Sequence, residues 1–173
     1  MGPSTGGQRN NSVKREIDVK VNGEQYSVVV DTRETLLDVL RYRLGFMGTK
    51  EGCGNGNCGS CTIHLNGATA NSCLVFAVET DGAEVTTVEG IAANGKLHPV
   101  QQAFIEHGAL QCGFCTPGFI MSATALLEQK SNLTEHEIRL ALAGNLCRCT
   151  GYDKIVRAVM AVSQTKSQIK EPQ

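Results

Sequence analysis

Eight cysteines are the residues whose type and spacing could carry chemistry in this chain of 173 residues. They fall into two quartets, the first made of Cys53, Cys58, Cys61 and Cys73 and the second of Cys112, Cys115, Cys147 and Cys149. Four thiolates are the ligand set of a [2Fe–2S] cluster, and they also suit one zinc ion. The number and grouping of the cysteines therefore predict two metal centres, one for each quartet.

The first quartet has the spacing C-x4-C-x2-C, followed after eleven intervening residues by a fourth cysteine. This frame is typical of plant-type [2Fe–2S] loops, whereas zinc sites more often use paired C-x2-C knuckles. The segment 45–61 also holds six glycines, which let backbone N–H groups approach an anionic cluster closely. We therefore expect a [2Fe–2S] cluster in this loop.

The second quartet reads C-x2-C and then, after 31 residues, C-x-C. Both pairs precede a segment with helical periodicity. Cys115 is followed by Thr116, expected as an N-cap, and by Pro117 at the first helical position, while Cys149 is followed by Thr-Gly. The positive ends of two helix dipoles would stabilise an anionic centre, so the sequence predicts a pseudo-twofold pair of helices there.

Two β-hairpins are expected in the first half of the chain. Alternating apolar residues at 17–21 and 26–30 flank Asn22-Gly23, and a similar pattern at 62–65 and 68–73 flanks a second Asn-Gly pair. Asn-Gly favours the two-residue type I′ turn that joins antiparallel strands. The second hairpin would deliver the last cysteine of the first quartet.

One helix and one further strand complete this half. Thr35 is expected to cap a helix that runs to about Arg43 and stops at Gly45, and a short strand is expected over 85–88. Hairpin, helix, cysteine loop and hairpin in this order are typical of a β-grasp, plant-type ferredoxin-like domain.

The second half is helical by its periodicity. Four helices are expected, over 99–107, 117–130, 135–143 and 152–164. Thr134 and Glu137 have the spacing of a capping box for the third helix, and Gly144 is expected to end it.

The fold class is therefore α+β, with a ferredoxin-like domain followed by a four-helix [2Fe–2S]-binding domain. The expected division is a flexible tail at 1–14, the first domain at 15–90, a linker at 91–97, the helical domain at 98–164 and a C-terminal tail at 165–173.

Composition excludes several classes of function. Sixteen Lys and Arg against seventeen Asp and Glu give a net charge of −1, which does not suit nucleic-acid binding. The longest apolar run, 74–78, is too short for a transmembrane segment. Residues 1–12 lack the apolar core of a signal peptide, so we expect a cytoplasmic protein and no disulfide framework. No phosphate-binding loop or nucleophile motif is present, so no bond-making catalytic residue is expected.

The sequence resembles the iron–sulfur small subunit, or N-terminal region, of xanthine oxidase-type molybdenum hydroxylases. The resemblance rests on three segments: GTKEGCGNGNCGSCTIHLNG at 48–67, LQCGFCTPGFIM at 110–121 and AGNLCRCTGYDKIV at 143–156. It implies a [2Fe–2S] cluster in each domain, with the two quartets as ligands.

The same resemblance implies a function and partners. The chain would relay single electrons between molybdopterin in a large subunit, for which the cytosine dinucleotide form is one option, and FAD in a medium subunit. The complex would be a heterotrimer, doubled as (αβγ)2. Gln111 and Cys149 match residues that contact the pterin. Because the chain ends at 173, it resembles a separate small subunit rather than a fused enzyme.

Two alternatives remain open at this point. A stand-alone ferredoxin-type carrier would use the same two clusters without fixed partners. A structural adaptor with two zinc ions would use the same cysteines without redox chemistry, although the spacing of the first quartet is a poor zinc pattern.

Overall fold

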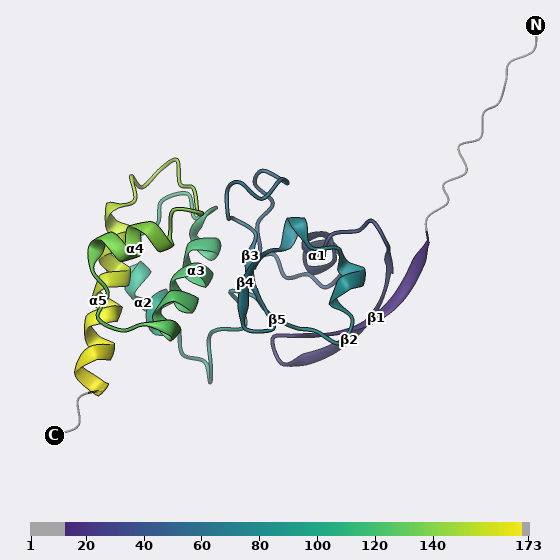
Figure 1. Ribbon diagram of the computed structural model, residues 1–173, viewed down its shortest axis with the longest axis horizontal. Coiled ribbons are helices and arrows are strands. Elements are labelled where there is room, and N and C mark those ends of the chain that lie inside the picture. Colours follow the sequence, from purple (N-terminus) through teal and green to yellow (C-terminus); the bar gives the residue numbers. More distant parts are fainter. Residues whose placement is uncertain (1–12, 171–173) are drawn as a thin grey trace, which may run out of the picture.

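The protein is described here by a computed structural model that covers residues 13–170 (Figure 1). The expected tail at 1–14 lies almost entirely outside the described residues, as do the last three residues of the tail expected at 165–173.

The first half of the chain forms a five-stranded mixed sheet with the strand order β2-β1-β5-β3-β4. The strands are β1 (Lys14–Val21), β2 (Glu24–Asp31), β3 (Thr62–Leu65), β4 (Ala68–Asn71) and β5 (Glu84–Thr86). β1 pairs antiparallel with β2 and parallel with β5, while β3 pairs antiparallel with both β4 and β5. This is the β-grasp arrangement that the sequence predicts.

Both predicted hairpins are confirmed, and their turns explain the registers. Asn22 and Gly23 have φ angles of 52° and 88°, and Asn66 and Gly67 have φ angles of 50° and 82°. Two consecutive left-handed residues are what a type I′ turn requires, because its twist matches that of the paired strands. Each hairpin is therefore fixed by its Asn-Gly pair.

The predicted helix after the first hairpin begins as expected. Thr35 forms a capping box with Asp38, and α1 (Leu36–Asp38) continues directly as a π-helical turn, η1 (Val39–Arg43). Gly45 follows with a φ of 79°. The helix packs its apolar side on the sheet, and the buried residues of this core are Val19, Val21, Leu36, Leu40, Ile63 and Val85.

Two strands are shorter than the sequence predicts. β5 ends at Thr86 because the N–H of Thr87 donates to the side chain of Asn22, at 2.8 Å, and leaves the sheet. β4 ends at Asn71, so Cys73 lies in a short 3₁₀ helix, η2 (Ser72–Leu74), and not in a strand. The Ser72 hydroxyl donates to the carbonyl of Cys61 at 2.8 Å, which turns the chain at this point. A second 3₁₀ helix, η3 (Ala77–Thr80), precedes β5.

The second half forms the four predicted helices, α2 (Pro99–Glu106), α3 (Thr116–Gln129), α4 (Glu135–Ala141) and α5 (Asp153–Lys170). They enclose their own apolar core, whose largest buried side chains are Phe104, Phe119, Ile138 and Ile155. None of the helices within residues 13–170 is both long and apolar enough to cross a membrane.

Three helix ends differ from the predictions. Cys115 is the N-cap of α3, so Thr116 is the first helical residue instead. α4 ends at Ala141, before Gly144, because the chain tightens into turns that bury Leu142 and Asn145. α5 runs to Lys170, six residues past the expected end, since no Gly or Pro interrupts the segment 153–170.

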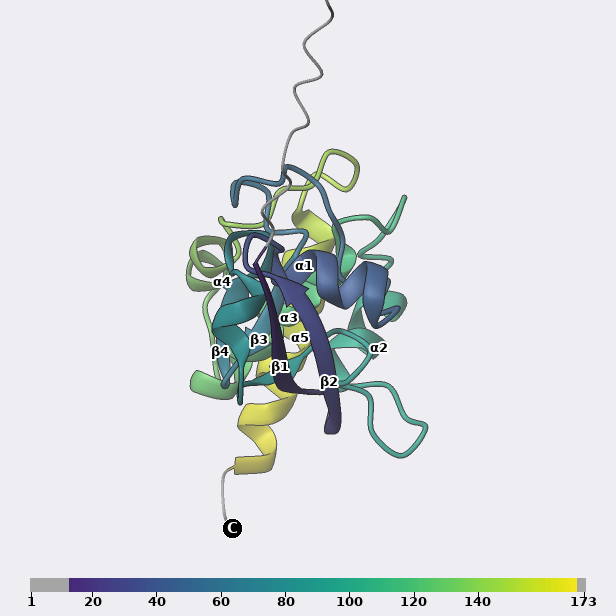
Figure 2. The same cartoon turned by 90° about the vertical axis from the view of Figure 1, so that its right-hand side faces the viewer.

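The two halves pack directly against each other, with α3 beside β3 and β4 (Figures 1 and 2). His64 on β3 is buried in this contact, and its Nε2 lies 2.9 Å from the carbonyl oxygen of Met121 on α3. The cysteine loop between η1 and β3 and the loop before α5 lie on the same side of the molecule in both views.

Candidate iron–sulfur sites

The sulfurs of the first quartet gather in two pairs. Cys61 and Cys73 are buried, and their Sγ atoms lie 3.4 Å apart. Cys53 and Cys58 lie nearer the surface, and their side chains are hydrogen-bonded to each other. A Cβ atom on Gly52 would lie 2.7 Å from the sulfur of Cys58, so a larger residue at this position would displace that sulfur. The loop is thus shaped tightly around its cysteines.

One thiol of each pair has a shifted pKa, and the two shifts have opposite directions. Backbone hydrogen bonds, chiefly from Asn55, lower the pKa of the exposed Cys53 thiol to about 7. Burial raises the pKa of Cys61 to about 11. Because thiolates and not thiols bind metal, Cys53 is prepared for ligation, whereas Cys61 loses its proton only as the metal enters.

The second quartet is also arranged as two pairs. The Sγ atoms of Cys112 and Cys149, both exposed, lie 3.5 Å apart, and this contact raises the pKa of Cys149. Cys115 and Cys147 are half-buried and share a side-chain hydrogen bond. Burial raises the pKa of Cys115 to about 12. Each quartet therefore has one pair at the surface and one pair turned inward.

This pairing distinguishes between the two kinds of centre that four cysteines could hold. Two thiolates on one tetrahedral metal lie about 3.8 Å apart, because the metal–sulfur bonds are about 2.3 Å long. A zinc ion needs four ligands around one point, whereas a [2Fe–2S] cluster takes two thiolates on each of two irons. The cysteines fit the cluster better.

The turn after Cys147 forms hydrogen bonds with both the sulfur and the backbone N–H of that residue. The hydroxyl of Thr150 donates to the sulfur of Cys147 at 3.0 Å, and the N–H of Cys147 donates to the Tyr152 hydroxyl at 3.0 Å. Burial acts to raise the pKa of Cys147, but the hydrogen bonds from the Thr150 side chain and amide outweigh it, so the pKa is lowered. Both hydrogen bonds fix where this thiolate lies.

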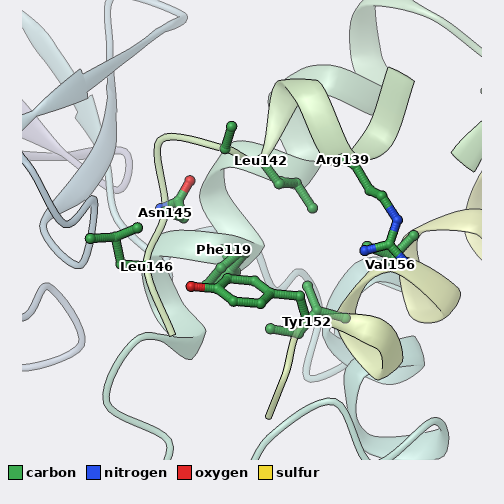
Figure 3. Close-up of a pocket in the computed structure, with 9 residues that line it drawn as sticks. Phe119, Arg139, Leu142, Asn145, Leu146, Tyr152 and Val156 are labelled. Carbon is green, nitrogen blue, oxygen red and sulfur yellow. The ribbon is translucent and has the colours of Figure 1, made fainter. Parts of the chain in front are cut away.

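Tyr152 adopts a backbone conformation that is unusual for a bulky residue. Its φ is 69°, and its ring packs edge-on against Phe119 with the ring centroids 6.2 Å apart. Both rings line a small apolar cavity beside Asn145 and Leu146, as Figure 3 shows. The packing and the hydroxyl contact together maintain the strained turn. The sequence pattern predicts the helix α5 but does not predict that Tyr152 stabilises the turn before it.

The two cysteine loops touch each other through backbone and side-chain hydrogen bonds. The N–H of Leu146 donates to the carbonyl of Cys58 at 2.9 Å, and the side-chain amide of Asn145 donates to the carbonyl of Gly59 at 2.9 Å. Ser122 on α3 donates to the other end of the Asn145 side chain at 2.7 Å. Asn145 is buried although it is polar, and nothing in the local sequence pattern indicates its contact with Gly59.

Gln111 and Cys149 lie on the same exposed edge of the helical domain. Gln111 directly precedes Cys112, whose sulfur contacts that of Cys149, and all three residues are exposed. Side chains placed in this way are open to a group outside the chain.

Comparison with known protein families divides the chain as the geometry does. Residues 19–90 match the 2Fe-2S iron-sulfur cluster binding domain, and residues 87–160 match the [2Fe-2S] binding domain. The fold and the sites thus define a protein with two [2Fe–2S]-binding domains.

Relatives that match over most of their length identify the family more closely. The chain is 54% identical over 145 residues to the nicotine 6-hydroxylase small subunit of Paenarthrobacter nicotinovorans, covering 84% of this chain and 87% of the relative. It is 47% identical to the nicotinate dehydrogenase small FeS subunit of Eubacterium barkeri, covering 84% and 93%. The crystal structure of quinoline 2-oxidoreductase from Pseudomonas putida 86 superposes with a TM-score of 0.85 at 41% identity, covering 90% of this chain and 97% of the other.

The chain belongs to the family of iron–sulfur small subunits of xanthine oxidase-type molybdenum hydroxylases, which are oxidoreductase complexes. The resemblance described from the sequence is thereby confirmed.

Proposed function

We propose that this chain is the electron-transfer subunit of a molybdenum hydroxylase and relays single electrons between a molybdopterin centre and FAD. Bound in the two quartets, [2Fe–2S] clusters supply one-electron oxidation and reduction without making or breaking substrate bonds. Family membership and the two cluster-binding domains support this function.

The ligands follow from the sulfur pairs. Cys53, Cys58, Cys61 and Cys73 would hold the first cluster, and Cys112, Cys115, Cys147 and Cys149 the second. The chain's own part is to fix these thiolates, with one pair of each quartet more deeply placed than the other. All eight cysteines are free thiols, as ligation requires.

The observation that carries the proposal is the direct contact of the two cysteine loops. Cys58 belongs to the first quartet, and Leu146 directly precedes Cys147 of the second, so their 2.9 Å backbone hydrogen bond joins the two ligand segments. A structural adaptor would not need its two centres joined, whereas electron exchange is favoured by a short bonded route.

The second centre would face molybdopterin. Gln111 would donate a hydrogen bond to the pterin through its side-chain amide, and Cys149 would contact the pterin edge through its sulfur. The exposure of both residues supports this role. Molybdopterin, with the cytosine dinucleotide form as one option, would belong to a large subunit and FAD to a medium subunit, in an (αβγ)2 assembly.

No residue of this chain would act in bond-making catalysis, and substrate would bind in the large subunit. We place the complex in the cytoplasm, where reducing conditions keep cysteine thiols available for cluster assembly.

The test is to purify the chain anaerobically from its native host. We expect about four iron and four acid-labile sulfide per chain, two distinct electron paramagnetic resonance (EPR) signals on reduction, and co-purification with larger molybdenum- and flavin-containing chains. Stoichiometric zinc without visible absorbance would overturn the proposal. Recovery only as a free iron–sulfur monomer would favour the stand-alone carrier.

A further inference from the structure

One side chain near the second centre is aimed at a sulfur without being a ligand. The hydroxyl of Thr150 lies 3.0 Å from the Sγ of Cys147, and the Thr150 backbone N–H lies 3.4 Å from the same atom. Thr150 is half-buried, so water competes only in part for this hydroxyl. The contact therefore persists in the folded chain.

The direction of the hydroxyl proton follows from its other neighbour. The N–H of Tyr152 donates to the Thr150 oxygen at 3.3 Å, so that oxygen acts as an acceptor on one side. The single hydroxyl proton is then free to point at Cys147. Tyr152 can reach back in this way because its φ is 69°, and Gly151 before it has a φ of 67°. The turn is thus built to present an O–H donor to the sulfur.

A hydrogen-bond donor beside a ligand sulfur interacts with the negative charge on that sulfur. One-electron reduction of a cluster adds one negative charge, which spreads onto the ligand sulfurs, and no bond forms or breaks. A hydrogen bond to a ligand sulfur stabilises the more negative state, so it raises the reduction potential. The thiolate that receives the bond lies on the inward pair, where the lower dielectric strengthens the interaction.

We propose that Thr150 sets the reduction potential of the second centre through its hydrogen bond to Cys147. This inference rests on the proposed function, because it takes Cys147 to be a cluster ligand. Thr150 is a positioning and tuning residue that leaves the ligand set unchanged. It makes the second centre a better acceptor for electrons that leave the molybdenum subunit.

The chain offers a matched control. Thr116 follows Cys115 of the same quartet as Thr150 follows Cys149, yet no hydrogen bond joins Thr116 to a cysteine sulfur in the part of the chain that the structure describes. The substitution T116V therefore removes a hydroxyl near the same centre without removing a donor to sulfur.

The experiment is a redox titration of the purified complex, in which the EPR signals of the two clusters are the readout. In T150V, we expect the equilibrium constant for reduction of the second cluster to fall about tenfold, which is about 59 mV for one electron. The first signal keeps its midpoint. T150S retains the hydroxyl donor, and T116V retains the hydrogen bond from Thr150 to Cys147. In both variants, the midpoint potential of the second cluster should therefore stay near the wild-type value. Should T150V not load its second cluster, T150A removes the same hydroxyl with less crowding.

Several outcomes would overturn the inference. They are an unchanged midpoint in T150V or T150A, an equal shift of both signals, or a shift in T116V as large as that in T150V. Failure of the proposed function is distinguishable, since the wild-type chain would then lack the two iron–sulfur signals or would show them only as a free monomer.

Discussion

The side-chain amide of Asn145 donates a 2.9 Å hydrogen bond to the backbone carbonyl of Gly59, 86 residues earlier in the chain. This bond connects the segment just before Cys147 to the segment just after Cys58, next to the backbone bond from Leu146. Asn145 therefore holds together the two loops that carry the cysteines.

Replacing Asn145 by Leu should loosen this junction. The carbonyl of Gly59 keeps its hydrogen bonds from the N–H and the hydroxyl of Thr62, so the change removes one of three donors, which costs about 0.5–1.5 kcal/mol. We expect a lower unfolding midpoint and slower electron exchange between the two centres, measured by freeze-quench EPR of the complex. Ser122→Ala, which removes only the support of Asn145, should have a smaller effect. Equal effects of the two substitutions would contradict this role of Asn145.

Replacing Gly118 by Ala should disturb the same junction from the side of α3. A Cβ atom at Gly118 would lie 2.2 Å from the carbonyl oxygen of Gly59, which is backbone and cannot move cheaply. Overpacking of this kind costs about 1–3 kcal/mol, although alanine is the better helix former. Gly144→Ala is the control, because its Cβ would meet nothing within 4 Å. In urea unfolding, the Gly118 variant should have a clearly lower midpoint than the Gly144 variant. Equal midpoints would refute the close approach of Gly118 to the carbonyl of Gly59.

Replacing Cys149 by Ser should damage the second centre alone. Its sulfur pairs with that of Cys112, whereas the first quartet lies in the other domain. We expect one EPR signal to disappear while the other keeps its shape, and electrons from molybdenum no longer to reach FAD. Cys53→Ser is the complementary variant and should remove the other signal. Loss of both signals in either variant would show that the two centres do not assemble separately.

Replacing Gln111 by Ala should leave both clusters in place. Gln111 is exposed and is not one of the proposed ligands, so iron and sulfide contents should match the wild type. We expect weaker association with the pterin-bearing subunit or slower electron transfer from it. Gel filtration measures the association, and stopped-flow reduction measures the electron transfer. Gln102 on α2, which is also exposed, provides a control substitution. Wild-type turnover in the assembled Gln111 variant would rule out the pterin contact.

Thiol reactivity in the metal-free chain should follow the exposure and pKa of each cysteine. Cys53 is exposed and its pKa is about 7, whereas burial raises the pKa values of Cys61 and Cys115 to about 11 and about 12. Because the thiolate is the nucleophile, iodoacetamide should modify Cys53 first and the other two last. Below pH 7, the Cys53 rate should fall about tenfold per pH unit. Peptide mapping over time measures these rates, and uniform labelling would contradict the expected order.

Local signals in the sequence were sufficient for much of the fold. Asn22-Gly23 predicts its hairpin because only a type I′ turn uses two left-handed residues in succession. Thr35 and Thr134 predict helix starts because a hydroxyl and an acid three residues later satisfy each other's backbone groups. Such features depend on neighbours in the chain and on little else.

Features that depend on distant contacts could not be predicted in this way. Gly144 suggests a helix end, yet α4 ends at Ala141, because the chain tightens there into turns in which Ala143 and Asn145 donate to the third residue before them. Asn145 meets Gly59 only after both domains fold, so its polarity alone suggests a solvated turn. The spacing of the cysteines predicts two quartets but not which sulfurs pair, since pairing is decided by the path of the whole loop.

The junction between the loops also bears on when the protein becomes complete during its synthesis. Domains generally fold in the order in which they leave the ribosome, so the β-grasp sheet can form first. The carbonyl of Cys58 nevertheless meets its donor, and the carbonyl of Gly59 the last of its three donors, only after residues 145 and 146 have been made. The loop of the first quartet therefore acquires its full set of hydrogen bonds only when the chain is nearly finished, and not while its own domain is leaving the ribosome.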